Sequence, residues 1–210
     1  MFQDEYSRWC QAELVDFDLK RELTEIAGDE DAIRERFAAS LSFGTAGLRG
    51  TLGVGTNRMN IWVVRQATQG IADWVKTKGG SQTVAISYDS RLKGWNFARD
   101  AASVLAANGI QVRLYDELMP VPALSFATRY YNCNAGIMIT ASHNPAKYNG
   151  YKAYGADGCQ VTDEDAAIVY AAIQKTDVLG GAKFMSFAEG VEKGLIRFVE
   201  DACKEAFYAA

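Results

Sequence analysis

The feature that most constrains this fold is a short apolar run that ends abruptly in a long polar loop. Residues Ala135–Ile139 have the pattern of a buried strand. The residues that follow, 140–152, read T-A-S-H-N-P-A-K-Y-N-G-Y-K. Pro145 cannot continue a strand, and it keeps Asn144 away from helical backbone angles. We therefore expect Ser142 just beyond the carboxyl end of a strand, where open α/β sheets place their ligand-binding residues.

The second half of this loop is expected to turn the chain back into another strand. Asn149-Gly150 is a strong signal for a two-residue turn, because both residues tolerate positive φ. In the extended segment 151–154, Lys152 and Tyr154 would share one face of the strand. A hydroxyl, an imidazole, an amide and an ammonium would then face one small space, from Ser142, His143, Asn144 and Lys152. On composition alone, the same residues are also typical of a polar surface loop.

The rest of the chain alternates between strand and helix patterns. Apolar runs indicate strands at 83–88 and 111–115. Helical signals cover 61–78, 96–108, 123–131, 162–175 and 195–208, the first with Asn60 as its N-cap and Gly79-Gly80 at its end. The alternation predicts the α/β class, a three-layer αβα sandwich with a mostly parallel (mixed) sheet, preceded by N-terminal helices.

Residues 1–40 are expected to form a helical extension that packs on a domain of residues 41–210. Apolar residues recur at roughly helical intervals within 4–39. We expect Gly28 to separate two helices, and the acids at 29–31 to favour the start of the second through the helix dipole. A metal site at these acids is the weaker alternative, because acids in a first turn need no other explanation.

Two further loops are candidates for ligand binding. Residues 43–50 read F-G-T-A-G-L-R-G, and glycines at intervals of three would let the backbone approach a ligand closely. This is not a Walker loop, since no Gly-Lys-Ser/Thr follows, and a lone glycine-rich loop is more often a turn. The segment 89–91, D-S-R, follows the strand at 83–88 and is expected at the same edge of the sheet.

Composition and charge limit the class of ligand. The chain has 210 residues and a net charge of −4, whereas nucleic-acid binders are usually basic, so we expect no nucleic-acid partner. The start is not a signal peptide and no run is apolar enough to span a bilayer, so we expect no membrane partner and a cytoplasmic location. Acids are absent between Glu35 and Asp73 and between Glu117 and Asp157, and these segments contain two of the loops, which suits a small anionic ligand. The four cysteines lack a C-x-x-C pair, and the single histidine, His143, rules out a multi-histidine zinc site.

Two of these strings also resemble the signatures of one enzyme family. T-A-S-H-N-P with its N-G-Y-K extension resembles the phosphoserine loop of the α-D-phosphohexomutases, the phosphoglucomutase/phosphomannomutase family. F-G-T-A-G-L-R-G and the following G-T-N-R-M-N resemble the amino-terminal signature of the same family. The resemblance covers nearly all of the chain, but only domain I of the family's four domains. It implies that Ser142 carries the phosphoryl group that is exchanged with the sugar.

The resemblance implies roles for the other candidate residues. Arg49, His143 and Lys152 would belong to the catalytic site, and Lys152 would assist proton transfer or hold the phosphoryl oxygens. Supporting contacts to phosphate or substrate would come from Thr45, His143, Asn144 and Arg91. A purely structural His143, or a plain contact between Asp89 and Arg91, is the alternative at those positions.

The activity implied is the interconversion of hexose 1-phosphate and hexose 6-phosphate through a phosphoserine enzyme and a bisphosphate intermediate. Mg²⁺ would bind through the phosphate on Ser142, and glucose 1,6-bisphosphate would act as activator. The family supplies the other metal ligands from a D-G-D-x-D-R loop in its second domain, and no such string occurs here. The expected partners are therefore sugar phosphates and the family's C-terminal domains, and the chain alone is expected to be inactive. Alternatives are a phosphopentomutase or glucose-1,6-bisphosphate synthase of the same family, or a non-catalytic phosphosugar-binding domain.

Overall fold

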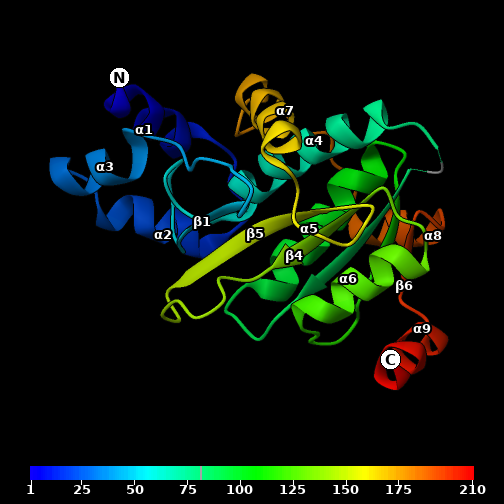
Figure 1. The fold of residues 1–210 in the computed structure, drawn as a ribbon. Coiled ribbons are helices and arrows are strands. Elements are labelled where there is room, and N and C mark those ends of the chain that lie inside the picture. Colours follow the sequence, from blue (N-terminus) through cyan, green and yellow to red (C-terminus); the bar gives the residue numbers. More distant parts are fainter. Residues whose placement is uncertain (81) are drawn as a thin grey trace.

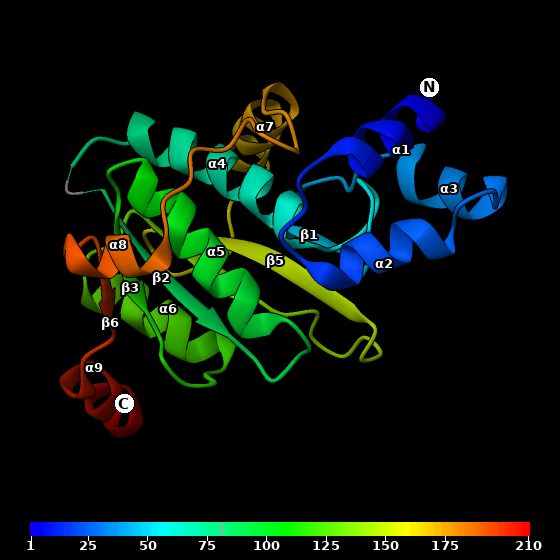
Figure 2. The same ribbon diagram turned by 180° about the vertical axis from the view of Figure 1, so that it is seen from behind.

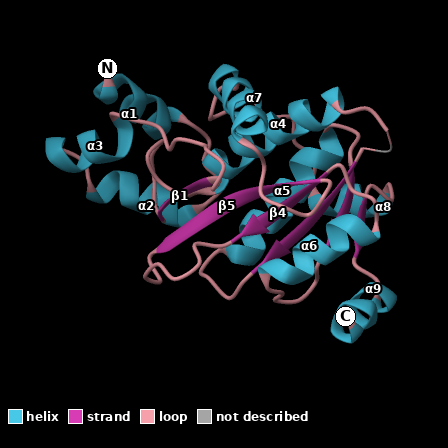
Figure 3. Cartoon of the chain, in the orientation of Figure 1, coloured by secondary structure: helices cyan, strands magenta, loops and turns pink. Residues whose placement is uncertain are grey.

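A computed structural model describes residues 1–80 and 82–210, which form one mixed sheet flanked by helices (Figures 1 and 3). The helices are α1 (Phe2–Gln11), α2 (Phe17–Glu25), α3 (Glu30–Phe37), α4 (Ile61–Thr77), α5 (Gly94–Ala107), α6 (Val121–Tyr130), α7 (Asp163–Lys175), α8 (Phe187–Glu192) and α9 (Asp201–Ala209). The strands are β1 (Leu48–Thr51), β2 (Thr83–Tyr88), β3 (Gln111–Leu114), β4 (Ala135–Ile139), β5 (Tyr148–Gly155) and β6 (Ile196–Phe198). Among the described residues, no helix is long and apolar enough to cross a membrane.

The sheet has the order β1-β5-β4-β2-β3-β6. β4, β2, β3 and β6 run parallel, while β5 is antiparallel to both β4 and β1. The prediction of a mostly parallel, mixed sheet is confirmed. Since the carboxyl ends of parallel strands meet at one edge, the loops after β2 and β4 are brought together there.

Helices cover both faces of the sheet, because its strands are apolar on both sides. In β2, Val84 and Ile86 belong to one core cluster and Ala85 to the other, as period-two alternation requires. α6 lies in front of the sheet in Figure 1, and α5 and α8 lie in front of it in the opposite view of Figure 2. α4 packs against α5 and α7 on the α5 side, and α9 packs against α6. These contacts form the predicted three-layer αβα arrangement.

The amino-terminal segment forms three helices where the sequence predicted two. α1 ends at Gln11, and Asp16 caps α2 by accepting a hydrogen bond from the backbone N–H of Asp18. The periodic apolar pattern runs through this break, which is why it was missed. Gly28, with φ of +84°, separates α2 from α3 as expected. The three helices gather next to β1 (Figure 1), and Glu22 of α2 accepts a hydrogen bond of 2.7 Å from the backbone N–H of Val54.

The predicted two-residue turn at Asn149-Gly150 is wrong, because β5 runs through both residues. Asn149 pairs with Gly50 and Gly150 with Arg49 in β1, a strand that the sequence analysis did not anticipate. The chain reverses earlier, where the backbone N–H of Tyr148 donates to the carbonyl of Pro145 at 2.9 Å. Pairing with a distant strand therefore overrides the local turn preference.

The single helix predicted over 195–208 is also wrong. Its first part is β6, which pairs in parallel with β3, and only its second part is helical, as α9. α8 was not predicted. Both errors involve elements of three and six residues, which are too short for a periodic pattern to distinguish strand from helix.

Candidate active site

The candidate site is built around the loop that follows β4. The hydroxyl of Thr140 accepts a hydrogen bond of 2.9 Å from the backbone N–H of Ser142 and donates one to Asp89 at the end of β2. Ser142 has φ of +55°, in the left-handed region that non-glycine residues rarely occupy. Such strain persists only where the surrounding structure holds it. Here it presents an exposed hydroxyl, whose Oγ lies 3.5 Å from Nδ1 of the exposed His143.

Arg91 holds this loop from the neighbouring β2–α5 connection. Its guanidinium donates to four backbone carbonyls, those of Ser142 at 2.5 Å, Asn144 at 2.8 Å, Tyr148 at 3.0 Å and Pro145 at 3.2 Å. It also lies 3.7 Å from the carboxylate of Asp89. The contact with Asp89 and the support of the loop, which the sequence left as alternatives, therefore occur together. One side chain with only 11% of its surface exposed fixes most of the backbone around Ser142.

Arg49 joins the glycine-rich segment to the same loop. It lies on β1, and its Nη1 donates to Oδ1 of Asn144 at 2.9 Å. β1 and the Ser142 loop are brought together by β5, which pairs with β1 and with β4. Within residues 1–80 and 82–210, the exposed guanidinium of Arg49 makes no hydrogen bond besides the one to Asn144, so its other donors can meet an anion.

Thr45 and Lys152 are less closely connected to the Ser142 loop than Arg91 and Arg49 are. Gly44 and Gly47 exchange backbone hydrogen bonds of 2.7 and 3.1 Å, and Thr45 lies between them, half-exposed. Gly47 packs directly on the backbone of β5 at Tyr151 and Lys152. Within residues 1–80 and 82–210, neither Thr45 nor Lys152 makes a side-chain hydrogen bond or ion pair. The segment 44–47 and Lys152 are therefore adjacent through the backbone.

The close approach at Gly47 gives a stability prediction. Its φ is +75°, and a Cβ atom there would lie 2.0 Å from the carbonyl oxygen of Tyr151, which is backbone and cannot swing away. Gly47→Ala should lower the free energy of unfolding by roughly 3–4 kcal/mol, as measured by chemical denaturation. Gly28→Ala is the control, since φ is +84° but nothing lies within 4 Å, so only about 1 kcal/mol should be lost. Equal losses would show that the contact with β5 does not matter.

Comparison with known proteins decides the family. The sequence of residues 40–179 matches the family model of the phosphoglucomutase/phosphomannomutase α/β/α domain I. The chain belongs to this family.

Curated relatives of this mutase-family chain include two phosphoglucomutases. That of Staphylococcus haemolyticus (strain JCSC1435) is 46% identical over 132 residues, and that of Staphylococcus aureus (strain USA300) is 46% identical over 131 residues. The matches cover 63% and 62% of this chain but 24% of each relative. The chain thus spans about a quarter of the length of the curated relatives it matches.

Solved structures of the family share the fold. A putative phosphomannomutase from Thermus thermophilus matches with 30% identity and a TM-score of 0.61, over 74% of this chain and 35% of that chain. A phosphoglucomutase/phosphomannomutase family protein from Burkholderia thailandensis matches with 23% identity and a TM-score of 0.61, over 78% of this chain and 34% of that one. The second likeness supports the fold alone.

Sequence reasoning missed how Thr140, Asp89 and Asn149 organise the site of this mutase domain. Thr140 and Asp89 bridge the ends of β4 and β2, and the buried Asn149 donates its side-chain amide to the carbonyl of Leu92 at 3.0 Å. The hydroxyl of a threonine directly after a strand often hydrogen-bonds to the backbone two residues further on, so the role of Thr140 could have been predicted from its position. The role of Asn149 could not have been predicted in this way, since its hydrogen-bond partner lies 57 residues away in sequence. Tyr151, between these loops, is fully buried, and burial raises the pKa of its phenol, so it belongs to the core.

The residues present do not fit a complete Mg²⁺ site. Asp89 contacts the loop, but its oxygens already accept from Thr140 and from the backbone N–H of Arg91. Across the described parts of the chain, no group of three or more His, Cys, Asp or Glu side chains could hold a metal ion. Mg²⁺ requires near-octahedral oxygen ligands, and a phosphate on Ser142 would supply only part of that set.

Proposed function

We propose that this chain is the amino-terminal catalytic domain of a phosphoglucomutase or phosphomannomutase, which interconverts hexose 1-phosphate and hexose 6-phosphate. Residues 41–210 would be its first domain and residues 1–40 a helical extension. The observation that carries the proposal is Ser142, which is exposed and left-handed in a loop that Arg91 and Arg49 hold in place. A rigidly held hydroxyl, in a loop that also binds the exposed guanidinium of Arg49, suits a covalent phosphoryl carrier.

The proposed reaction uses Ser142 Oγ as both acceptor and donor of the phosphoryl group. In loading, Oγ attacks phosphorus of a sugar bisphosphate such as glucose 1,6-bisphosphate, the bond from phosphorus to the sugar oxygen breaks, and the serine proton passes to that oxygen. In turnover, phospho-Ser142 transfers the group to a free hydroxyl of a hexose monophosphate, and the other phosphate of the bisphosphate then returns to the serine. Each step exchanges one P–O bond for another, so positioning and charge stabilisation dominate the catalysis.

The side chains around Ser142 have distinct roles in this proposal. A phosphoserine carries about −1.5 to −2 charges at neutral pH, and Arg49 would offset part of that charge. Asn144 orients Arg49, and Arg91 positions the backbone rather than the phosphate, because its two terminal nitrogens donate to four carbonyls and its Nε is buried on the side of Asp89. His143 and Lys152 would move protons or hold phosphoryl oxygens, with Thr45 as a further contact to phosphate.

Phosphopeptide mapping tests the central claim. The full-length gene product incubated with labelled glucose 1,6-bisphosphate should carry label on Ser142, and Ser142→Ala should carry none. Ser90→Ala is the matched control, since Ser90 is also an exposed serine in an adjacent loop, and it should label normally. Label on another residue, or undiminished label in Ser142→Ala, would contradict the proposal.

A further inference from the structure

The connection that contains Arg91 is itself held by an unusual residue. Lys93 precedes α5 with φ of 63° and ψ of 7°, so it is left-handed like Ser142. The turn is tight: the N–H of Gly94 donates to the carbonyl of Arg91 at 3.0 Å. A left-handed lysine is costly, and it persists only if other contacts fix it.

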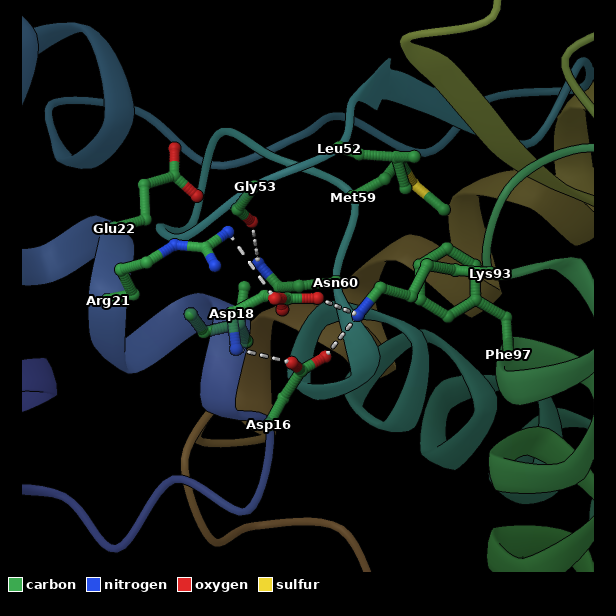
Figure 4. A pocket seen from close by; sticks show the side chains of 11 residues that line it. Asp16, Asp18, Arg21, Glu22, Leu52, Gly53, Met59, Asn60, Lys93 and Phe97 are labelled. Carbon is green, nitrogen blue, oxygen red and sulfur yellow. Dashed lines mark hydrogen bonds and ion pairs between the residues drawn. The ribbon is translucent and has the colours of Figure 1, made fainter.

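The contacts that fix Lys93 come from the amino-terminal helices. Its ammonium donates to Asp16 at 2.9 Å and to Asp18 at 3.0 Å, at the start of α2 (Figure 4). Burial alone would lower the pKa of Lys93, but the hydrogen bonds to both carboxylates outweigh it and the pKa is raised. The hydrogen bond from Lys93 in turn lowers the pKa of Asp18. We call Lys93, Asp16 and Asp18 the Lys93 clamp.

The Lys93 clamp borders a pocket whose lining also includes buried side chains of the core. The pocket has a volume of about 240 Å³, and its apolar lining consists of Leu19 together with Leu52, Met59 and Phe97 (Figure 4). The ammonium therefore joins the start of α2 to the start of α5 at the edge of this pocket. Leu19 of α2 belongs to the same buried core cluster as Met59 and Phe97, and the clamp adds charged hydrogen bonds between the start of α2 and the residue before α5.

Three consecutive residues link the clamp to the candidate site. Lys93 binds α2, the carbonyl of Leu92 accepts from Asn149 of β5, and Arg91 binds the carbonyls around Ser142. A shift of the backbone at Lys93 would therefore move the group that holds Ser142. Misplacement by about 1 Å is enough to impair a reaction that depends on alignment.

We propose that Lys93 is a positioning residue, through which the amino-terminal helices fix the Arg91 connection and hence the Ser142 loop. This inference rests on the proposed function of Ser142 for its catalytic meaning. The coupling itself does not depend on activity and is measured separately.

Amide hydrogen exchange of the 210-residue chain tests the coupling. The reporters are the N–H groups of Ser142, Asn144 and Tyr148, each hydrogen-bonded within the loop. In Lys93→Met these amides should exchange about fivefold faster, while core amides of α4 and β2 stay unchanged. Lys93→Arg should restore slow exchange because it keeps the charge. Asp18→Asn, which removes one of the two carboxylates, should give about a twofold increase and stands in if Lys93→Met does not fold.

Lys78→Met is the matched control, since Lys78 is similarly exposed and forms an ion pair of 2.8 Å with Asp165, on α7. It should leave the loop amides at wild-type rates. Unchanged loop exchange in Lys93→Met, or an equal increase throughout the chain, would overturn the inference. If exchange rises as expected but Ser142 takes no label from glucose 1,6-bisphosphate, the coupling stands and the proposed function fails.

Discussion

Replacing Arg91 with methionine should lower the rate of phosphoryl transfer to Ser142 by about 10²–10³-fold, because the loop loses its main support. One guanidinium binds four loop carbonyls, and methionine can donate to none of them. Charge-assisted hydrogen bonds contribute about 1.5–3 kcal/mol each, although water will replace some of them, so we also expect a loss of roughly 2–4 kcal/mol in the free energy of unfolding. Arg91→Lys should recover little, since a compact ammonium cannot span the same carbonyls.

Both effects are measurable in one set of variants. Labelling of Ser142 by glucose 1,6-bisphosphate is followed by rapid quench in the full-length gene product, and unfolding is followed by denaturant titration. Arg197→Met is the control, because the exposed Arg197 also donates to a backbone carbonyl, that of Gly194 at 3.1 Å, but outside the candidate site. It should label at the wild-type rate. Labelling of Arg91→Met within about threefold of wild type would remove Arg91 from the support of the loop.

Local chemistry in the sequence was enough to predict most of the scaffold. Asn60 is an example: its side-chain oxygen accepts from the backbone N–H groups of Trp62 and Val63, as its residue type at a helix start predicts. The apolar runs of β2 and β4 were recognisable because both faces of each strand are buried. The loops after these two strands could then be placed at one edge of the sheet without any coordinates.

Long-range pairing explains what the sequence could not reveal. The hydrogen-bond partners of Arg91 are backbone carbonyls 51 to 57 residues further along the chain, and no residue type marks a carbonyl as an acceptor. Asn149-Gly150 has the composition of a turn, yet it lies within β5 because it pairs with β1. The Lys93 clamp was hidden for the same reason, since 77 residues separate Lys93 from Asp16.

The 210-residue chain alone should show negligible mutase activity, at least about 10³-fold below a full-length phosphoglucomutase of the family. Each of the two acid clusters, 29–31 and 163–165, has a member that is already engaged: Asp29 caps α3, and Asp165 binds Lys78 and the indole N–H of Trp74. No described cluster of acids offers Mg²⁺ its octahedral set of oxygens. The resemblance places the missing ligands in a D-G-D-x-D-R loop of the second domain, and this sequence contains no such string. Affinity for Mg²⁺ should accordingly be weak.

Loss of activity must be distinguished from loss of structure. The chain should fold, because apolar clusters fill both faces of the sheet, so circular dichroism and a cooperative unfolding transition are measured on the same sample. Turnover is assayed with glucose 1-phosphate, Mg²⁺ and glucose 1,6-bisphosphate beside the full-length enzyme, and Mg²⁺ binding by titration calorimetry. Turnover within about tenfold of that enzyme would correspond to a loss of under about 1.4 kcal/mol of transition-state stabilisation. That result would refute a site shared between domains, because the groups of this chain would then supply nearly all of the catalysis.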